Sequence, residues 1–157
     1  MDALNHEFLF FLHYAQKNGL RYLLIGGYAV NFHGYVRNTA DMDVWVAPTN
    51  ENKNQFITTL LCMKYTQSEI ADLYTEDFIK PWIGTIGTGV GEIDLLTIVH
   101  HKPLFDEAEK EKGVFEVEPG RFMNFVPFPF LREMKLRAAR PKDLWDIARL
   151  EELRAKK

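Results

Sequence analysis

Apolar and polar residues change their spacing several times along the chain, and each change marks a predicted element. Residues 3–18 place apolar side chains three and four positions apart, the spacing of an amphipathic helix that packs on a core. Residues 22–25 form a short continuous apolar run, which is typical of a buried strand. The first part of the chain therefore predicts a helix over 3–18, a strand over 22–25, a short helix over 28–32, an exposed loop over 35–40 and a strand over 41–46.

The same reasoning extends to the rest of the chain. The helix-start signal Pro48-Thr49, followed by Glu51, predicts a helix over residues 49–63. Residues 65–80 fit either a helix or an irregular segment. The later predicted elements are a glycine-weakened strand over 82–88, a strand over 92–99, a short helix over 103–112, short strands over 114–117 and 122–126, and two helices between 130 and 153.

The two final helices are predicted to separate at Arg140-Pro141, because proline fits well in the first turn of a helix. The last helix is expected to pack on the domain through its apolar residues, which are Leu144, Trp145, Ile147, Ala148, Leu150 and Leu153. Trp45 and Trp82 are likewise expected to lie in the core.

Composition indicates one soluble globular domain that spans residues 1–157, since 46% of the residues are apolar and 26% are charged. The longest apolar runs fall short of the roughly 20 residues that span a bilayer, and the first residues lack a signal-peptide pattern, so we expect a cytoplasmic protein with no membrane partner. Cys62 is the only cysteine, which excludes an internal disulfide. A net charge of −3 argues against a broad nucleic-acid surface, so a polynucleotide substrate would have to be held locally.

Candidate chemistry gathers between residues 21 and 46. Gly26-Gly27 end the first strand and leave backbone N–H groups uncovered beside a helix start, a combination that favours anions such as phosphate. Asp41 and Asp43 lie two positions apart on the next strand, so they project to the same side about 6.6 Å apart along the backbone. Two carboxylates at that spacing suit Mg²⁺, which binds one or two carboxylates plus substrate phosphates.

A third carboxylate is predicted on the strand over 92–99. If that strand lies beside the one that carries Asp41 and Asp43, Asp94 joins them, with Glu92 as the alternative because it shares the same face.

The order of these residues resembles the nucleotidyltransferases of the DNA polymerase β-like superfamily. The matching residues are G-G-Y-A, then H-G, then R-x-T-x-D-x-D, in the form found in small bacterial enzymes related to abortive-infection toxins and antibiotic nucleotidyltransferases. A second match is K-x-x-A-x-R-x-K-D-x-x-D-I, read from Lys135 to Ile147. The resemblance implies an α+β nucleotidyltransferase fold, a small mixed sheet flanked by helices with a C-terminal helix pair.

The resemblance also implies roles for the acids and glycines. Asp41 and Asp43 would coordinate one or two Mg²⁺ ions, and Asp94 would bind the catalytic metal ion and accept the proton of the acceptor hydroxyl. Gly26 and Gly27 would approach the triphosphate.

The cations of the C-terminal motif would then bind phosphate. Lys135 is the first choice for the phosphate anchor, Lys142 the second, and Arg37 a weaker third. Asp143 would orient a lysine or contact the acceptor.

The resulting hypothesis is a Mg²⁺-dependent nucleotidyltransferase that moves a nucleoside monophosphate from a nucleoside triphosphate, ATP among them, to a hydroxyl acceptor. The acceptor can be a tRNA, a protein or a small molecule, and the protein can be one component of a toxin–antitoxin pair, with an antitoxin or a second copy as partner. The alternatives are a non-catalytic module of the same fold that binds a nucleotide or a partner, and an interaction domain unrelated to nucleotides. The sequence leaves the acceptor, the preferred base and the oligomeric state open.

Overall fold

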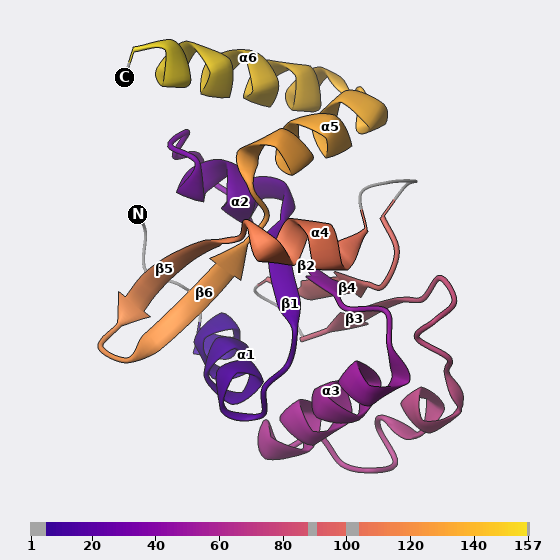
Figure 1. Ribbon diagram of the computed structural model, residues 1–157. Coiled ribbons are helices and arrows are strands. Elements are labelled where there is room, and N and C mark those ends of the chain that lie inside the picture. Colours follow the sequence, from indigo (N-terminus) through magenta and orange to yellow (C-terminus); the bar gives the residue numbers. More distant parts are fainter. Residues whose placement is uncertain (1–5, 88–90, 100–103, 157) are drawn as a thin grey trace.

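The computed structural model describes residues 6–87, 91–99 and 104–156, and its centre is a mixed sheet with helices on both faces (Figure 1). This arrangement confirms the predicted α+β class. The helices are α1 (His6–Lys17), α2 (Gly26–Phe32), α3 (Asn50–Cys62), α4 (Phe105–Lys110), α5 (Phe128–Ala138) and α6 (Pro141–Ala155), with a 3-10 helix η1 (Ala71–Thr75). The strands are β1 (Tyr22–Ile25), β2 (Met42–Val46), β3 (Ile83–Ile86), β4 (Ile93–Leu96), β5 (Gly113–Glu118) and β6 (Arg121–Phe125).

The six strands lie in the order β3-β4-β2-β1-β6-β5. β2 is antiparallel to β1 and parallel to β4, and β6 is parallel to β1. The pairs β3–β4 and β5–β6 are antiparallel. The predicted neighbourhood of the second and third strands is therefore confirmed, since β2 and β4 are adjacent.

Most predicted elements are present, with two local differences. α2 begins at Gly26 itself, so the glycines form the first turn of the helix and no separate turn precedes it. Residues 65–80, which the sequence left undecided between a helix and an irregular segment, contain the 3-10 helix η1 between irregular stretches. α3 begins where Thr49 predicted it, because the Thr49 side chain accepts a hydrogen bond from the backbone N–H of Asn52.

The core lies on both faces of the sheet because successive strand residues point in opposite directions. In β1, Tyr22 and Leu24 belong to the cluster that packs on α1 and α3, whereas Leu23 belongs to the cluster formed with α2, α4, α5 and α6. In β2, Val44 faces the first cluster and Trp45 the second. The alternation therefore places residue 43 on the side of α2, α5 and α6.

The prediction for the inward face of α6 is wrong at three positions. Leu144, Trp145 and Ala148 are exposed, and the indole N–H of Trp145 donates to the hydroxyl of Tyr35 at 3.0 Å. The buried stripe consists instead of Asp143, Asp146, Ile147 and Leu150, at the helical spacing of three and four residues. The reason is that Asp143 and Asp146 on this stripe pair with Lys135 and Arg37 in the interior. The helix is therefore oriented so that its acids point inward, and Leu144 and Trp145 point to solvent.

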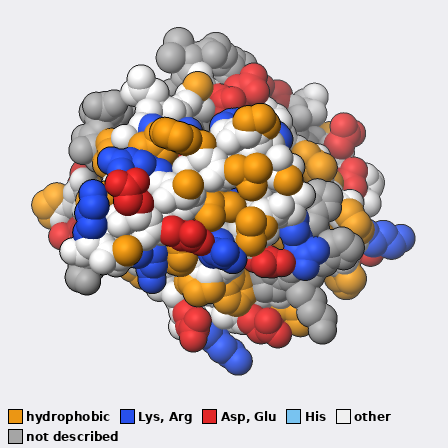
Figure 2. All heavy atoms as spheres, turned by 90° about the horizontal axis from the view of Figure 1, so that it is seen from above, with side chains coloured by type: hydrophobic (Ala, Val, Ile, Leu, Met, Phe, Trp, Pro, Cys, Tyr) orange, Lys and Arg blue, Asp and Glu red, His pale blue; other side chains and the backbone are white. Residues whose placement is uncertain are grey.

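The face that carries α5 and α6 is accordingly mixed. Hydrophobic side chains gather at the middle of the face seen in Figure 2, with acidic and basic side chains among and around them. The exposed apolar residues of the two helices include Leu136, Leu144 and Trp145. Trp82 is half-buried and packs against the first core cluster, while Trp45 is buried as predicted.

None of the helices in the described part of the chain is both long enough and apolar enough to span a membrane.

Candidate functional site

A cavity of about 630 Å³ lies between the sheet and the C-terminal helices, and it contains every site residue predicted from the sequence. Its walls come from the end of β1, the start of α2, the loop before β2, β2, β4, α5 and the start of α6. The lining residues are Ile25, Gly26, Gly27, Arg37, Asn38, Thr39, Ala40, Asp41, Asp43, Asp94, Leu131, Met134, Lys135, Ala138, Arg140, Lys142 and Asp143.

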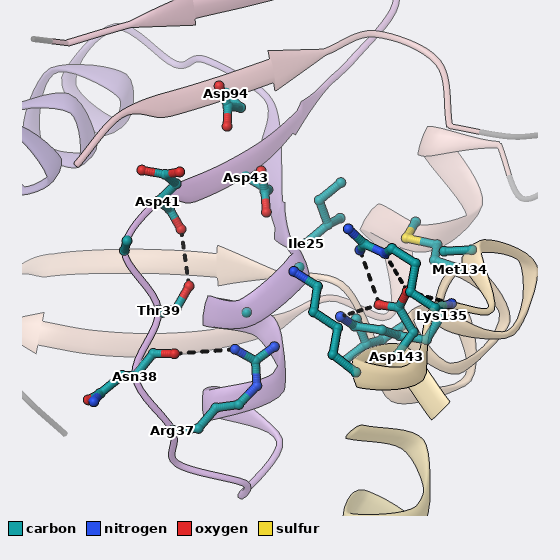
Figure 3. Close-up of a pocket in the computed structure, with 17 residues that line it drawn as sticks. Ile25, Arg37, Asn38, Thr39, Asp41, Asp43, Asp94, Met134, Lys135 and Asp143 are labelled. Atoms are coloured by element: carbon teal, nitrogen blue, oxygen red, sulfur yellow. Dashed lines mark hydrogen bonds and ion pairs between the residues drawn. The ribbon is translucent and has the colours of Figure 1, made fainter. Parts of the chain in front are cut away.

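Three carboxylates form one wall of the cavity (Figure 3). Asp43 of β2 lies directly beside Asp94 of β4 in the parallel register, and Asp41 precedes β2 by one residue. Asp94 accepts a hydrogen bond from Thr85 Oγ1 on β3 at 2.8 Å through its Oδ1 atom. Glu92 is absent from the described lining and donates its backbone N–H to Asp41 Oδ1 at 3.0 Å, so the structure places Asp94 and not Glu92 in the cavity.

The carboxylate of Asp43 has a raised pKa. Burial, the largest cause, and the negative charges of Asp94 and Asp41 together raise the pKa from its ordinary value of 3.8 to about 6, although Lys135 and Lys142 lower it in part. Like charges that face each other in neighbouring strands are destabilising. The acidic wall therefore favours a cationic ligand, because a positive charge there would offset both the repulsion and the burial.

The two glycines allow the start of α2 to lie against Asp43 of β2 and Thr39 of the loop before it. Gly26 has a φ of +65°, and a Cβ atom there would overlap the carboxylate of Asp43. A Cβ atom on Gly27 would lie only 2.5 Å from Thr39 Oγ1. Both positions thus require glycine for close approach, a packing role that the sequence did not predict, and both also line the cavity.

Lys135 occupies the opposite wall and is buried between two acids. Its Nζ lies 3.0 Å from Asp143 Oδ1 and 3.1 Å from Asp146 Oδ2. Asp143 also binds the guanidinium of Arg140, with 2.6 Å between Arg140 Nε and Asp143 Oδ2. Burial raises the pKa of Asp143, but the hydrogen bonds from Arg140 and Lys135 outweigh it and lower the pKa to about 2. The predicted role of Asp143 in orienting a lysine therefore matches a direct contact.

Asp146, the last acid of the C-terminal motif, does not line the cavity but binds two of its cations, a role that the sequence did not predict. It is buried, and its two oxygens accept from Arg37 Nε at 2.9 Å and Arg37 Nη2 at 2.8 Å. Its carboxylate joins the loop before β2 to α5 and α6, since Lys135 binds the same group. The signal was present, because Asp143 and Asp146 are three residues apart on one helix and therefore share a face.

The cations that line the cavity differ in how far they are already paired with acids. Arg37, Lys135 and Arg140 all pair with Asp143 or Asp146. Lys142 lines the cavity, and among the ion pairs of the described residues none involves it. Because Arg37 belongs to the loop before β2, the cations of α5 and the start of α6 that line the cavity are Lys135, Arg140 and Lys142, one more than the two carboxylates of α6 that they face. The helical wall therefore carries a net positive charge opposite the acidic wall.

The donor set of the acidic wall fits Mg²⁺ in its chemistry. Within residues 6–87, 91–99 and 104–156, no three His, Cys, Asp or Glu side chains come close enough together to form a metal-ion site by themselves. Mg²⁺ takes one or two carboxylates and completes its shell with water and substrate phosphate oxygens. Asp41 and Asp43 would hold such an ion together with Asp94, the register neighbour whose charge repels that of Asp43.

No known protein-family model matches this sequence, and a search of curated proteins gave no match either.

Proposed function

We propose that this protein is a Mg²⁺-dependent nucleotidyltransferase that transfers a nucleoside monophosphate from a nucleoside triphosphate to a hydroxyl acceptor. One observation carries the proposal: a single cavity has three carboxylates on one wall, a net positive helical wall opposite, and two glycines between them. A substrate that combines a polyphosphate with a bound cation matches both walls. The resemblance of the sequence motifs to nucleotidyltransferases supports the same reaction.

The reaction is an in-line displacement in which the acceptor oxygen forms a bond to the α-phosphorus while the bond to pyrophosphate breaks. Mg²⁺, when bound, would neutralise the triphosphate and lower the pKa of the acceptor hydroxyl. Asp41 and Asp43 would hold the metal ion. Asp94 would share in this and accept the acceptor proton, because Thr85 engages its Oδ1 and no described residue donates to its Oδ2.

The phosphate contacts follow from the ion pairs. Lys135 on α5 has two carboxylate partners on α6, so its role in the proposal is to hold Asp143 and Asp146 in place. Lys142 has no such partner among the described residues and lines the cavity, which makes it the preferred contact for the departing pyrophosphate. The ion pairs thus favour Lys142 over Lys135 as the phosphate contact, whereas Lys135 is the first choice from the sequence.

Calorimetry tests nucleotide binding directly. The native protein is titrated with each nucleoside triphosphate in the presence of Mg²⁺ and again in EDTA, and Asp43→Asn is titrated alongside. Asp72→Asn is the matched control, because Asp72 is exposed on η1 and lies outside the cavity. We expect Mg²⁺-dependent binding that Asp43→Asn loses and the control keeps. Absence of binding for every triphosphate in every metal condition would refute the proposal.

Transfer is tested with α-labelled triphosphates and a cell extract. Label in RNA, in protein or in a small molecule identifies the acceptor class. Metal-dependent binding without any transfer of label would favour the alternative of a non-catalytic nucleotide-binding module.

A further inference from the structure

A second groove, separate from the cavity described above, runs along β3. Its volume is about 580 Å³, and residues of α3, η1 and β3 line it. β3 is the last strand at one end of the sheet and has only β4 as a strand neighbour in the described chain. The outer edge of β3 therefore offers backbone groups that a further strand can pair with.

The floor of the groove is apolar. Phe56, Leu60 and Ile86 belong to the first core cluster or pack against it, and they line the groove. The ring of Trp82 lies over Gly84, where a Cβ atom would come within 2.5 Å of ring carbon Cζ2. Ile83 is 80% exposed at the strand edge, and the alternation along β3 places its side chain on the same face as Thr85, opposite to that of Ile86.

The rim of the groove is acidic. Glu69, Asp72 and Glu76 line it, and the described lining residues include no lysine or arginine. The hydrogen bonds that Glu69 accepts from Thr66 lower the pKa of its carboxyl, which keeps this part of the rim charged.

We propose that this groove binds an extended peptide segment of a partner protein, which pairs with the edge of β3 and carries alternating apolar and basic residues. The apolar residues would lie over Trp82 and Ile86, since alternate side chains of an added strand share a face. The basic residues alternate with them and point out of the groove, where their long side chains would reach toward Glu69, Asp72 and Glu76 at the rim. A second copy of this chain is a poorer occupant, because pairing two β3 edges would bring two such acidic rims together.

The proposal is independent of the nucleotidyltransferase activity, because the rim and floor residues lie outside the other cavity. β3 does touch that cavity at one point, the hydrogen bond from Thr85 to Asp94. An added strand would thus lie next to the strand that positions Asp94.

Peptide binding is measured by fluorescence anisotropy on the full chain. The probe is a fluorescein-labelled peptide of alternating lysine and valine, about eight residues long to cover a strand of typical length. The control peptide has glutamate in place of lysine. We expect saturable binding of the lysine peptide only, weakened several-fold when NaCl rises from about 50 to about 300 mM because the charges are exposed.

Two variants locate the site. Ile83→Lys places a cation on the β3 edge at an exposed position, and we expect it to weaken binding by about tenfold, or about 1.4 kcal/mol. Val114→Lys makes the same change on β5, the strand at the other end of the sheet, where the side chain is also exposed, and should leave binding unchanged. Hydrogen exchange should slow in β3 and not in β5 when the lysine peptide is added.

Several outcomes would overturn the proposal. These are equal binding of the glutamate peptide, equal effects of the two lysine variants, or exchange protection outside β3. Dimerisation of the peptide-free protein in sedimentation, abolished by Ile83→Lys, would instead assign the groove to a second copy. None of these outcomes depends on nucleotide binding, so failure here is distinguishable from failure of the proposed activity.

Discussion

Replacing Asp43 by asparagine should stabilise the metal-free protein and at the same time remove its Mg²⁺-dependent binding of triphosphate. The pKa of Asp43 rises from 3.8 to about 6 through burial and through the charges of Asp94 and Asp41. The folded state therefore binds a proton at Asp43 more readily than the unfolded state does. Ionised Asp43 thus lowers the free energy of unfolding.

The magnitude follows from linkage between protonation and folding. A pKa difference of about two units corresponds to about 3 kcal/mol, since each unit is worth about 1.36 kcal/mol. Asp43 is partly exposed, so we expect a gain of about 2 kcal/mol for Asp43→Asn after solvent screening is included. The cost of ionisation is absent below the unfolded pKa near 3.8 and complete once the pH exceeds about 6. The gain should therefore be small near about pH 4 and full near about pH 8.

Urea unfolding in EDTA, followed by tryptophan fluorescence at both pH values, measures this difference. Mg²⁺ should stabilise the native protein at the higher pH and leave Asp43→Asn unchanged. Asp72→Asn, the same chemical change at an exposed site, should alter the unfolding free energy by less than about 0.5 kcal/mol. Equal or lower stability of Asp43→Asn at the higher pH, or an equal gain at both pH values, would refute the electrostatic reasoning.

Three further predictions concern the helical wall and the glycine start of α2. Asp143→Asn should cost about 3 kcal/mol at neutral pH in urea unfolding, because Lys135 loses a buried partner. In the native protein, burial raises the pKa of Asp143, but its cationic neighbours outweigh this effect and lower the pKa to about 2. The contribution of Asp143 to the stability of the fold is therefore complete above about pH 4 and is lost as the pH falls through about 2. An acid titration followed by fluorescence measures this loss. Lys142→Ala should weaken Mg²⁺-dependent triphosphate binding about tenfold in calorimetry, or about 1.4 kcal/mol, with an unchanged melting temperature, whereas Lys135→Ala should lower the melting temperature as well. Gly26→Ala should cost about 2 kcal/mol or more, because its Cβ would overlap a carboxylate, and Gly19→Ala, at a similar φ in open space, should cost about 1 kcal/mol.

Each of these has a clear contrary result. Full stability of Asp143→Asn at neutral pH would mean that the ion pairs around Lys135 contribute nothing. Unchanged triphosphate affinity in Lys142→Ala would remove that residue from the site. Equal costs for the two glycine variants would show that close approach to the carboxylate is unimportant and that φ alone decides.

The acidic wall could be predicted from the sequence because its geometry depends on local rules. The spacing of Asp41 and Asp43 fixes their common side, and the alternation of apolar residues in β2 and β4 fixes which side that is. The placement of Asp94 then needed only that the two strands be neighbours, which the register confirms.

The helical wall could not be predicted to the same extent, because its inward face is partly charged. A search for apolar residues at helical spacing assigns Trp145 to the core, yet its indole lies outside and donates to Tyr35. Asp146 takes an inward position because Arg37 and Lys135, distant in sequence, neutralise it. Such partners are known only once the loop before β2 is placed against α6.

The pairing of β2 with β4 has a consequence for how reliably the acidic wall forms. A shift of one residue between these strands would bring Val44 to the cavity side and turn Asp43 into the apolar layer between the sheet and α3. Such a slip is costly twice over, since it buries a charge and exposes an aliphatic side chain. The strand register that keeps the apolar side chains buried thus also fixes the side of the sheet to which the carboxylates point.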